Sequence, residues 1–316
     1  MLVGNVAVML QLRADRSYNI AGAVGKLAGK PLGTIIVLAF ALILATVVTQ
    51  AFEFEVIRFL EGYFDSVNSF IQAIMAAGIR RHQRELNKLQ CKLKEEDKRA
   101  LPIAIAEMRK YPGHDAEVLD YLAKSPSKDS SEFDEGLAQK AGKIDWRRLA
   151  PPVERYRIDS LSARLDSYPE MNRLLPTRLG NVLRAAEDKI DLRGANLEGY
   201  VLRYHDQLPA AMQSEHKDYR TRLDMYCSLT LVFFMLIVLS VVTLVNIRPV
   251  WGTAVALAVY ALMAGLSYQA AIASARSYGL VLQEIQEYLA RQDEPSETSE
   301  STALGRLLAL LHRNAV

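Results

Sequence analysis

Residues 225–275 decide the fold of this chain: MYCSLTLVFFMLIVLSVVTLVNIRPVWGTAVALAVYALMAGLSYQAAIASA. Arg248 is the only charged side chain in the stretch, and it lies in a turn-like segment, Asn246 to Val250. The turn separates two uncharged runs, residues 225–247 and 249–275. A bilayer core about 30 Å thick needs roughly 20 apolar residues in a helix. Both runs are long enough, so the sequence predicts a transmembrane hairpin.

A third uncharged run covers residues 31–52 and predicts a first transmembrane helix. It follows 30 residues of chain and lacks a small-residue cleavage site, which argues against a signal peptide. The next segment, residues 56–79, mixes apolar side chains with charges and is uncharged only from Ser66 to Ile79. That length is too short for a crossing and favours an interfacial or re-entrant segment.

These patterns predict an all-α fold, a polytopic membrane helix bundle with an inserted helical cytoplasmic domain. Averages over the chain hide this organisation, since 50% of the 316 residues are apolar and 23% are charged. We expect four parts: residues 1–79 with a flexible, glycine-containing approach to the first span, the basic helical domain 80–223, the hairpin 224–276, and the C-terminal part 277–316 with a cytoplasmic helix, an acidic linker and a terminal amphipathic helix.

The distribution of basic residues predicts the orientation. Lys217, Arg220 and Arg222 precede the second span, and Arg276 follows the third. Only Arg248 lies in the turn. Because cytoplasmic loops are enriched in Lys and Arg, we expect a multi-pass protein of a bacterial inner (plasma) membrane with its soluble domain in the cytoplasm. The side on which the N-terminus lies stays open.

Residues 176–189, PTRLGNVLRAAEDK, form the sharpest pattern outside the spans. Thr177 is a suitable N-cap. At 100° per residue the segment has one apolar face and one polar face. The predicted buried face holds Leu179, Val182, Leu183 and Ala186, and the candidate polar face holds Arg178, Asn181 and Arg184.

The block PTRLGNVLRAAED (Pro176 to Asp188) resembles a bacterial membrane-protein family of the actinomycete type whose members have no assigned function. FLEGYF (Phe59 to Phe64), the basic stretch from Arg80 and YQAAIASARSYG (Tyr268 to Gly279) are similar to segments of that family in the same order. After the block, an aromatic segment of the family is replaced by KIDLRGANLEGYVLRYHDQLP (Lys189 to Pro209). The resemblance implies a membrane protein and supplies no catalytic residues.

No sequence motif predicts an enzyme. The chain has no nucleophile elbow, phosphate loop or HExxH motif, and its five histidines are scattered. Cys91 and Cys227 predict neither a disulfide nor a metal site. The spans carry no ionisable side chains other than tyrosines, which argues against a pump. We expect no cofactor and no metal.

Two sets of residues in the hairpin are candidates for function. Ser240, Thr243 and Asn246 recur on one side of the second span and are the candidate pore-facing residues. Ala254, Ala258, Ala261 and Gly265 form a stripe of small residues on the third span, which allows close helix packing. Packing within the chain and packing between copies both remain open.

Basic residues after the first span form a third candidate set. A juxtamembrane helix would attract anionic lipid headgroups, and the same charges would suit a soluble phosphate. The candidate lipid or phosphate contacts are Arg80, Arg81, Arg84 and Lys88.

The sequence therefore supports three hypotheses of function. The first is a homo-oligomeric membrane effector or ion channel, of the kind used in bacterial antiviral defence, controlled by its cytoplasmic domain. The second is a membrane scaffold that recruits a cytoplasmic partner. The third is a membrane protein that senses a nucleotide or nucleic acid. The partners expected are the lipid membrane, further copies of the chain, and a cytoplasmic protein or anionic ligand.

Overall fold

The computed structural model describes most of the chain. Helices are the only regular structure within the described residues, which confirms the all-α class. The chain forms two compact units, one of Met1–Ile57 with Ala186–Val316 and the other of Arg58–Ala185. The described residues are 2–16, 18–51, 53–63, 69–111, 115–124, 134–190, 197–244 and 250–293.

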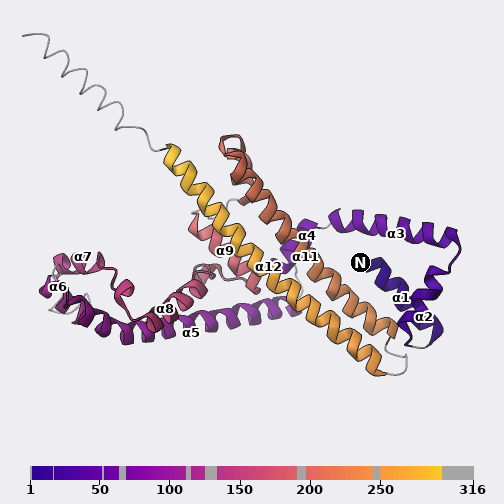
Figure 1. Cartoon of the computed structure of the whole chain (residues 1–316), viewed down its shortest axis with the longest axis horizontal. Helices are drawn as coiled ribbons and strands as arrows, with labels where there is room; N and C mark the ends of the chain where they lie inside the picture. Colours follow the sequence, from indigo (N-terminus) through magenta and orange to yellow (C-terminus); the bar gives the residue numbers. More distant parts are fainter. Residues whose placement is uncertain are drawn as a thin grey trace, which may run out of the picture. The chain divides into compact units, whose positions relative to one another are not determined.

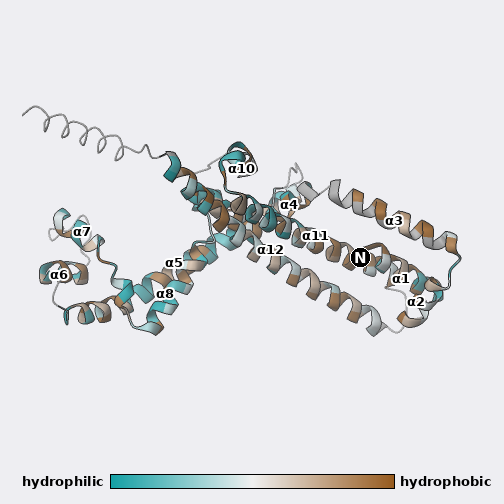
Figure 2. Ribbon diagram, turned by 45° about the horizontal axis from the view of Figure 1, so that its top comes forward, coloured by the Kyte–Doolittle hydropathy of each residue, from teal (hydrophilic) through white to brown (hydrophobic). Residues whose placement is uncertain are grey.

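The first unit is built on a long helical hairpin. α11 (Ala210–Leu244) and α12 (Val250–Asp293) lie side by side and run in opposite directions (Figure 1). Both helices are long and apolar enough to cross a membrane. The expected continuation of the third span beyond Arg276 is confirmed, because α12 ends only at Asp293. Colouring by hydropathy places the apolar side chains of both helices toward their connection (Figure 2).

Hydroxyl side chains in α11 are satisfied by the helix itself. Thr230, Ser240 and Thr243 donate to the carbonyl oxygens four residues earlier at 2.8, 2.7 and 2.7 Å. Near the connection, Thr253 Oγ1 donates to the carbonyl of Leu244 at 3.0 Å. An unpaired polar group in an apolar environment costs several kcal/mol, so these bonds let α11 and α12 keep an apolar exterior.

The N-terminal segment is helical, and the expected flexible approach to the first span is wrong. α1 (Leu2–Asp15) and α2 (Ile20–Ala28) are joined by an ion pair of 2.8 Å between Lys26 Nζ and Asp15 Oδ1. Asn19 caps α2 by accepting a hydrogen bond from Gly22 N at 2.9 Å. Packing of α1 against α11 offsets the low helix propensity of glycine. The buried cluster consists of Met9, Leu12, Ala23, Phe233, Leu236 and Leu244.

α3 (Leu32–Ala51) coincides with the first predicted span and is followed by the short α4 (Glu53–Glu61). Large apolar side chains of α3 are exposed, including Ile36 at 60% and Phe40 at 67%. Figure 2 shows the hydrophobic colouring of this helix. Exposure of this kind along an uncharged helix of 20 residues is what a lipid-facing helix requires.

The second unit is a helical domain around α5 (Ser69–Met108), a single helix of 40 residues. The uncharged stretch that ends at Ile79 is thus continuous with the basic stretch after it. The other elements are α6 (Ala116–Lys124), α7 (Glu135–Gly142), η1 (Trp146–Leu149), α8 (Pro152–Leu165), η2 (Met171–Arg173) and α9 (Arg178–Lys189), the last of which continues into the first unit.

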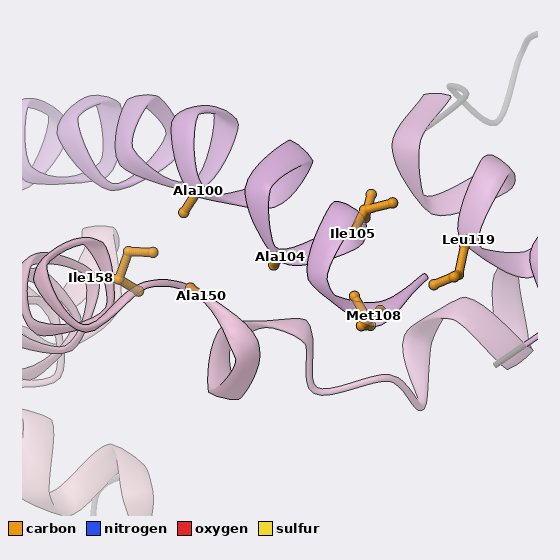
Figure 3. Close-up of a cluster of buried hydrophobic side chains, with 7 residues drawn as sticks. All are labelled: Ala100, Ala104, Ile105, Met108, Leu119, Ala150 and Ile158. Carbon is orange, nitrogen blue, oxygen red and sulfur yellow. The ribbon is translucent and has the colours of Figure 1, made fainter. Parts of the chain in front are cut away.

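A small apolar core holds the far end of α5 to its neighbours. Ala100 and Ala104 allow η1 and α8 to come close, and Met108 is fully buried beside Leu119 of α6 (Figure 3). Burying apolar side chains in this way contributes about 25 cal/mol per Å². The seven residues are Ala100, Ala104, Ile105, Met108, Leu119, Ala150 and Ile158.

The boundaries of the two units differ from the predicted domain limits of 80 and 223. Residues 197–223 belong with the hairpin, because α11 begins at Ala210 and is continuous into the apolar run. The short α10 (Leu197–Tyr204) and η3 (His205–Gln207) also belong to the first unit. The acidic linker after Asp293 and the terminal amphipathic helix lie outside the described residues.

Candidate functional site

The segment Glu61–Tyr63 lies against the N-terminal end of α9, and we call these two segments the clamp. Thr177 Oγ1 donates to the carbonyl of Glu61 at 2.7 Å. The same hydroxyl accepts from Gly180 N at 3.1 Å, which confirms Thr177 as the N-cap of α9. One side chain therefore both caps α9 and links it to the last residue of α4.

Two glycines make the clamp possible. Gly62 has φ +94°, a left-handed conformation that side chains with a Cβ rarely adopt. A Cβ on Gly180 would overlap the carbonyl oxygen of Glu61 and would lie 2.8 Å from a methyl carbon of Leu175. Pro176 also contacts α5, since its carbonyl oxygen would lie 2.8 Å from a Cβ at Gly78. Two separate chain segments, Glu61–Tyr63 and α5, thus converge on residues 175–180.

Arg184 extends the clamp by one turn of α9. Its Nε and one terminal nitrogen donate to the hydroxyl of Tyr63 at 2.8 and 2.7 Å. The guanidinium carbon of Arg184 lies 5.3 Å from the centre of the Tyr63 ring, and that of Arg58 lies 5.9 Å away. Both cations lie within cation–π distance of the Tyr63 ring, and such a contact is worth about 0.5–2 kcal/mol for each pair. No local pattern in the sequence pairs Tyr63 with Arg184, because 121 positions separate them.

The candidate polar face of α9 is largely turned inward. The expected apolar face is confirmed, because Leu179 and Leu183 are buried, as are Val182 and Ala186. Asn181, by contrast, is fully buried. Its Nδ2 donates to the carbonyl of Leu175 at 3.0 Å, and its Oδ1 accepts from Leu175 N at 2.7 Å. Asn181 is a structural link, because its buried side-chain amide pairs with both backbone polar groups of the half-buried Leu175.

His82 of α5 lies beside the clamp, where it forms a hydrogen bond with the backbone of Pro176. Its Nδ1 lies 3.3 Å from the hydroxyl of Tyr168. Burial lowers the pKa of His82 below its usual value, and the nearby cation Arg178 lowers it further. The charge of Glu85 and a hydrogen bond to the Pro176 backbone raise the pKa, but burial has the larger effect. Burial also raises the pKa of Tyr168 to about 12. At neutral pH both groups are uncharged, which suits a structural contact.

The outward side of α5 changes from apolar to basic along its length. Phe70 and Ile74 are 70% and 54% exposed near its start. The four candidate contacts lie farther along on the same side, because at 100° per residue all six residues fall on one face, opposite the buried Leu86 and Leu89. An apolar patch followed by cations suits a helix at a membrane surface. The exposed candidates are Arg80, Arg81, Arg84 and Lys88.

Of the candidate pore-facing residues, Ser240 and Thr243 are among the described residues, and neither is exposed. Ser240 is fully buried, and its Oγ lies 3.8 Å from the sulfur of Met9 in α1. Thr243 is half-buried and bonds to its own helix. Asn246 lies outside the described residues. α1 also contacts α12, because the Tyr260 hydroxyl donates a hydrogen bond to Asn5 Oδ1 at 3.0 Å. α1 therefore occupies the side of α11 that carries Ser240.

The small-residue stripe of α12 is exposed within the described part of the chain. A Cβ on Gly265 would have no atom within 4 Å. Large apolar neighbours on the adjoining side are exposed too, including Leu262 at 62% and Leu266 at 55%. The structure brings none of the four residues against another helix of the described chain; Ala254, Ala258, Ala261 and Gly265 are all exposed.

Comparisons with known proteins do not place the chain in a family. No family model matches it, and neither a curated protein nor a solved structure shows significant similarity. Among the described residues no group of three or more His, Cys, Asp or Glu side chains could hold a metal ion. Three features remain for a function to explain, namely the clamp, the apolar-to-basic side of α5 and the exposed stripe of α12.

Proposed function

We propose that the protein is a homo-oligomeric membrane effector, an ion channel of a bacterial inner membrane controlled by the unit Arg58–Ala185. The observation that carries the proposal is the exposed stripe of α12. In lipid, apolar side chains gain little by leaving one hydrocarbon environment for another, so helices associate where small residues allow close approach. A second copy of the hairpin could pack against this stripe, which no described helix of the same chain covers.

Placement in the membrane is supported by composition and by exposure. α11 and α12 meet the length and hydropathy expected of spans, and α3 has the length, lack of charge and exposed apolar side chains of a third. Arg80 and the cations after it would then lie among anionic headgroups on the cytoplasmic side. The apolar start of α5 would lie at the same interface.

Control of the channel would depend on α1 and α9. α1 covers Ser240, so the described arrangement corresponds to a closed channel and opening requires α1 to move away from α11. α9 is one continuous helix that begins at the clamp and ends against α12, where Ala186 Cβ would lie 2.8 Å from a Cβ on Gly279. Because α9 is a single helix, a displacement of its first turn at the clamp would be carried to its last turn beside Gly279.

Membrane potential in expressing cells tests the proposal. We expect expression of the full chain to depolarise bacterial cells, because even a weakly polar pore dissipates ion gradients. A potential-sensitive dye reports this during graded induction, with cells producing an unrelated membrane protein at equal level as the control. An oligomer that reaches the membrane and leaves the potential unchanged would support the alternative of a scaffold for a cytoplasmic partner.

The cytoplasmic placement of the second unit gives a separate prediction. Cys91 is exposed on α5 and Cys227 is buried in α11, so the native chain has one accessible thiol among its two cysteines. We expect a membrane-impermeant maleimide to label Cys91 in inverted membrane vesicles and not in intact cells. The variant Cys91→Ser should abolish labelling of the inverted vesicles, since Cys227 is buried. Efficient labelling of intact cells would reverse the orientation.

A further inference from the structure

A cavity of about 650 Å³ lies in the first unit beside the first turns of α11. Its walls come from α10 with η3 on one side and from residues 210–221 of α11 on the other. Cavities of 300–1,000 Å³ are typical of small-molecule sites. The wall is tied together by Gln213, whose Nε2 donates to the carbonyls of His205 and Leu208 at 2.9 Å each.

The polar side of the cavity is cationic. Lys217 and Arg220 line it together with His205 and His216, and no carboxylate is among the described residues that line it. Asp224 forms an ion pair with Arg220, with 3.2 Å between Oδ1 and Nε, but does not itself line the cavity. Lysine and arginine in a partly enclosed site bind phosphate through charge-assisted hydrogen bonds.

The opposite side of the cavity is apolar. Val201 is buried in its wall, and Leu202, which is 73% exposed, forms its rim. A small inorganic anion would leave the apolar side chains of Val201 and Leu202 in contact with water. A ligand in which an apolar group adjoins a phosphate would cover both halves, and covering apolar surface stabilises binding by about 25 cal/mol per Å².

The position of the cavity along α11 matches the depth of lipid headgroups. At a rise of about 1.5 Å per residue, Arg220 and Lys217 lie about 8 and 12 Å from Met225, where the uncharged run begins. The headgroup layer extends roughly 5–8 Å beyond the hydrocarbon core, so Arg220 lies at its outer edge and a lysine side chain reaches into it.

The cavity also contacts the seam of the hairpin. His216 Nε2 lies 3.0 Å from the hydroxyl of Tyr278 in α12, and Tyr278 is 1% exposed. A ligand against His216 therefore touches a side chain that joins α11 to α12. Occupancy of the cavity would bias how these two helices pack.

We propose that this cavity binds a phosphate-bearing amphiphile, with the phosphate at Lys217 and Arg220 and the apolar group against Val201 and Leu202. Such a ligand has two sources, an anionic phospholipid of the surrounding leaflet or a soluble phosphorylated compound. Only the lipid source rests on the membrane placement proposed above. Binding itself requires neither an oligomer nor a pore, so the two proposals can fail separately.

Binding to the full-length protein in an uncharged detergent tests the site. The probes are short-chain phosphatidylglycerol for the lipid source and inorganic phosphate for the soluble source, each titrated by calorimetry, with short-chain phosphatidylcholine as the zwitterionic comparison. We expect phosphatidylglycerol to bind more tightly than phosphatidylcholine. Lys217→Gln should raise the Kd for the bound anionic probe about tenfold. Lys217 is preferred to Arg220, because loss of Arg220 would leave Asp224 without its ion pair.

Two further variants keep the result decisive. Arg222→Gln removes a charge from the same helix outside the cavity and should change each Kd by less than about twofold. Leu202→Ser should weaken phosphatidylglycerol and leave phosphate unchanged, which separates the two halves of the cavity. Phosphate binding that exceeds lipid binding would assign the soluble source. The proposed site would be wrong if Lys217→Gln and Arg222→Gln weakened binding of the anionic probe equally. It would also be wrong if the native protein bound neither anionic probe more tightly than the Lys217→Gln variant does.

Discussion

Gly180→Ala is expected to lower the melting temperature of the purified protein by roughly 5 °C, the largest stability loss we predict for a single methyl group. The added Cβ would overlap the carbonyl oxygen of Glu61, which is backbone and cannot rotate away. Forcing a methyl group into a packed site costs about 1–3 kcal/mol or more, which exceeds the gain of up to about 1 kcal/mol in helix propensity. A loss of 1 kcal/mol shifts melting by about 2–8 °C.

Gly142→Ala provides the matched control. Gly142 is also helical, at the end of α7, and a Cβ there would meet nothing within 4 Å. Its melting temperature should stay the same or rise slightly, since alanine is favoured over glycine in helices. Thermal unfolding followed by circular dichroism in detergent compares the two. Equal melting of both variants would show that the clamp contributes no stability.

Gly265→Leu is expected to convert the oligomer to a monomer and to abolish depolarisation of expressing cells. The leucine side chain would stand where close approach of a second α12 is required. Within the chain the substitution has room, because no atom lies within 4 Å of a Cβ at this position. Folding of each copy should therefore be unaffected. Mass measurement in nanodiscs should show association weakened at least tenfold, equivalent to about 1.4 kcal/mol.

Ala273→Leu is the control for added bulk on α12. Ala273 is exposed and lies in the same uncharged run, rotated away from the stripe at 100° per residue. This variant should remain oligomeric and depolarise cells as the native chain does. A native protein that is monomeric at all workable concentrations would remove the channel proposal, since the few spans of one chain cannot enclose a water-filled path.

Local patterns predicted the helices well because helix periodicity and the absence of charge are properties of neighbouring residues. The uncharged runs located α3 and the two halves of the hairpin. Spacing at 100° per residue selected the buried residues of α9, including Leu183, and Thr177 as its cap. These inferences needed only residues near one another along the chain, within about four positions for the faces of α9 and about 20 for the uncharged runs.

The partners of polar side chains could not be predicted in the same way. Asn181 and Ser240 were assigned to polar or pore-facing sides, yet both are fully buried. Their surroundings are set by Leu175 and by Met9, the first six residues away across a turn and the second in a helix distant in sequence. A short polar side chain is stable in either solvent or core, provided that its hydrogen bonds are made.

The sequence by itself determined which segments are helical and apolar, since both follow from composition and spacing. Only the tertiary structure decided that the N-terminal residues form α1 against α11, that Glu61–Tyr63 meets the start of α9, and that the stripe of α12 is exposed among the described residues. These contacts join residues far apart in the sequence. Such pairings depend on shape complementarity between whole helices, which no local pattern encodes.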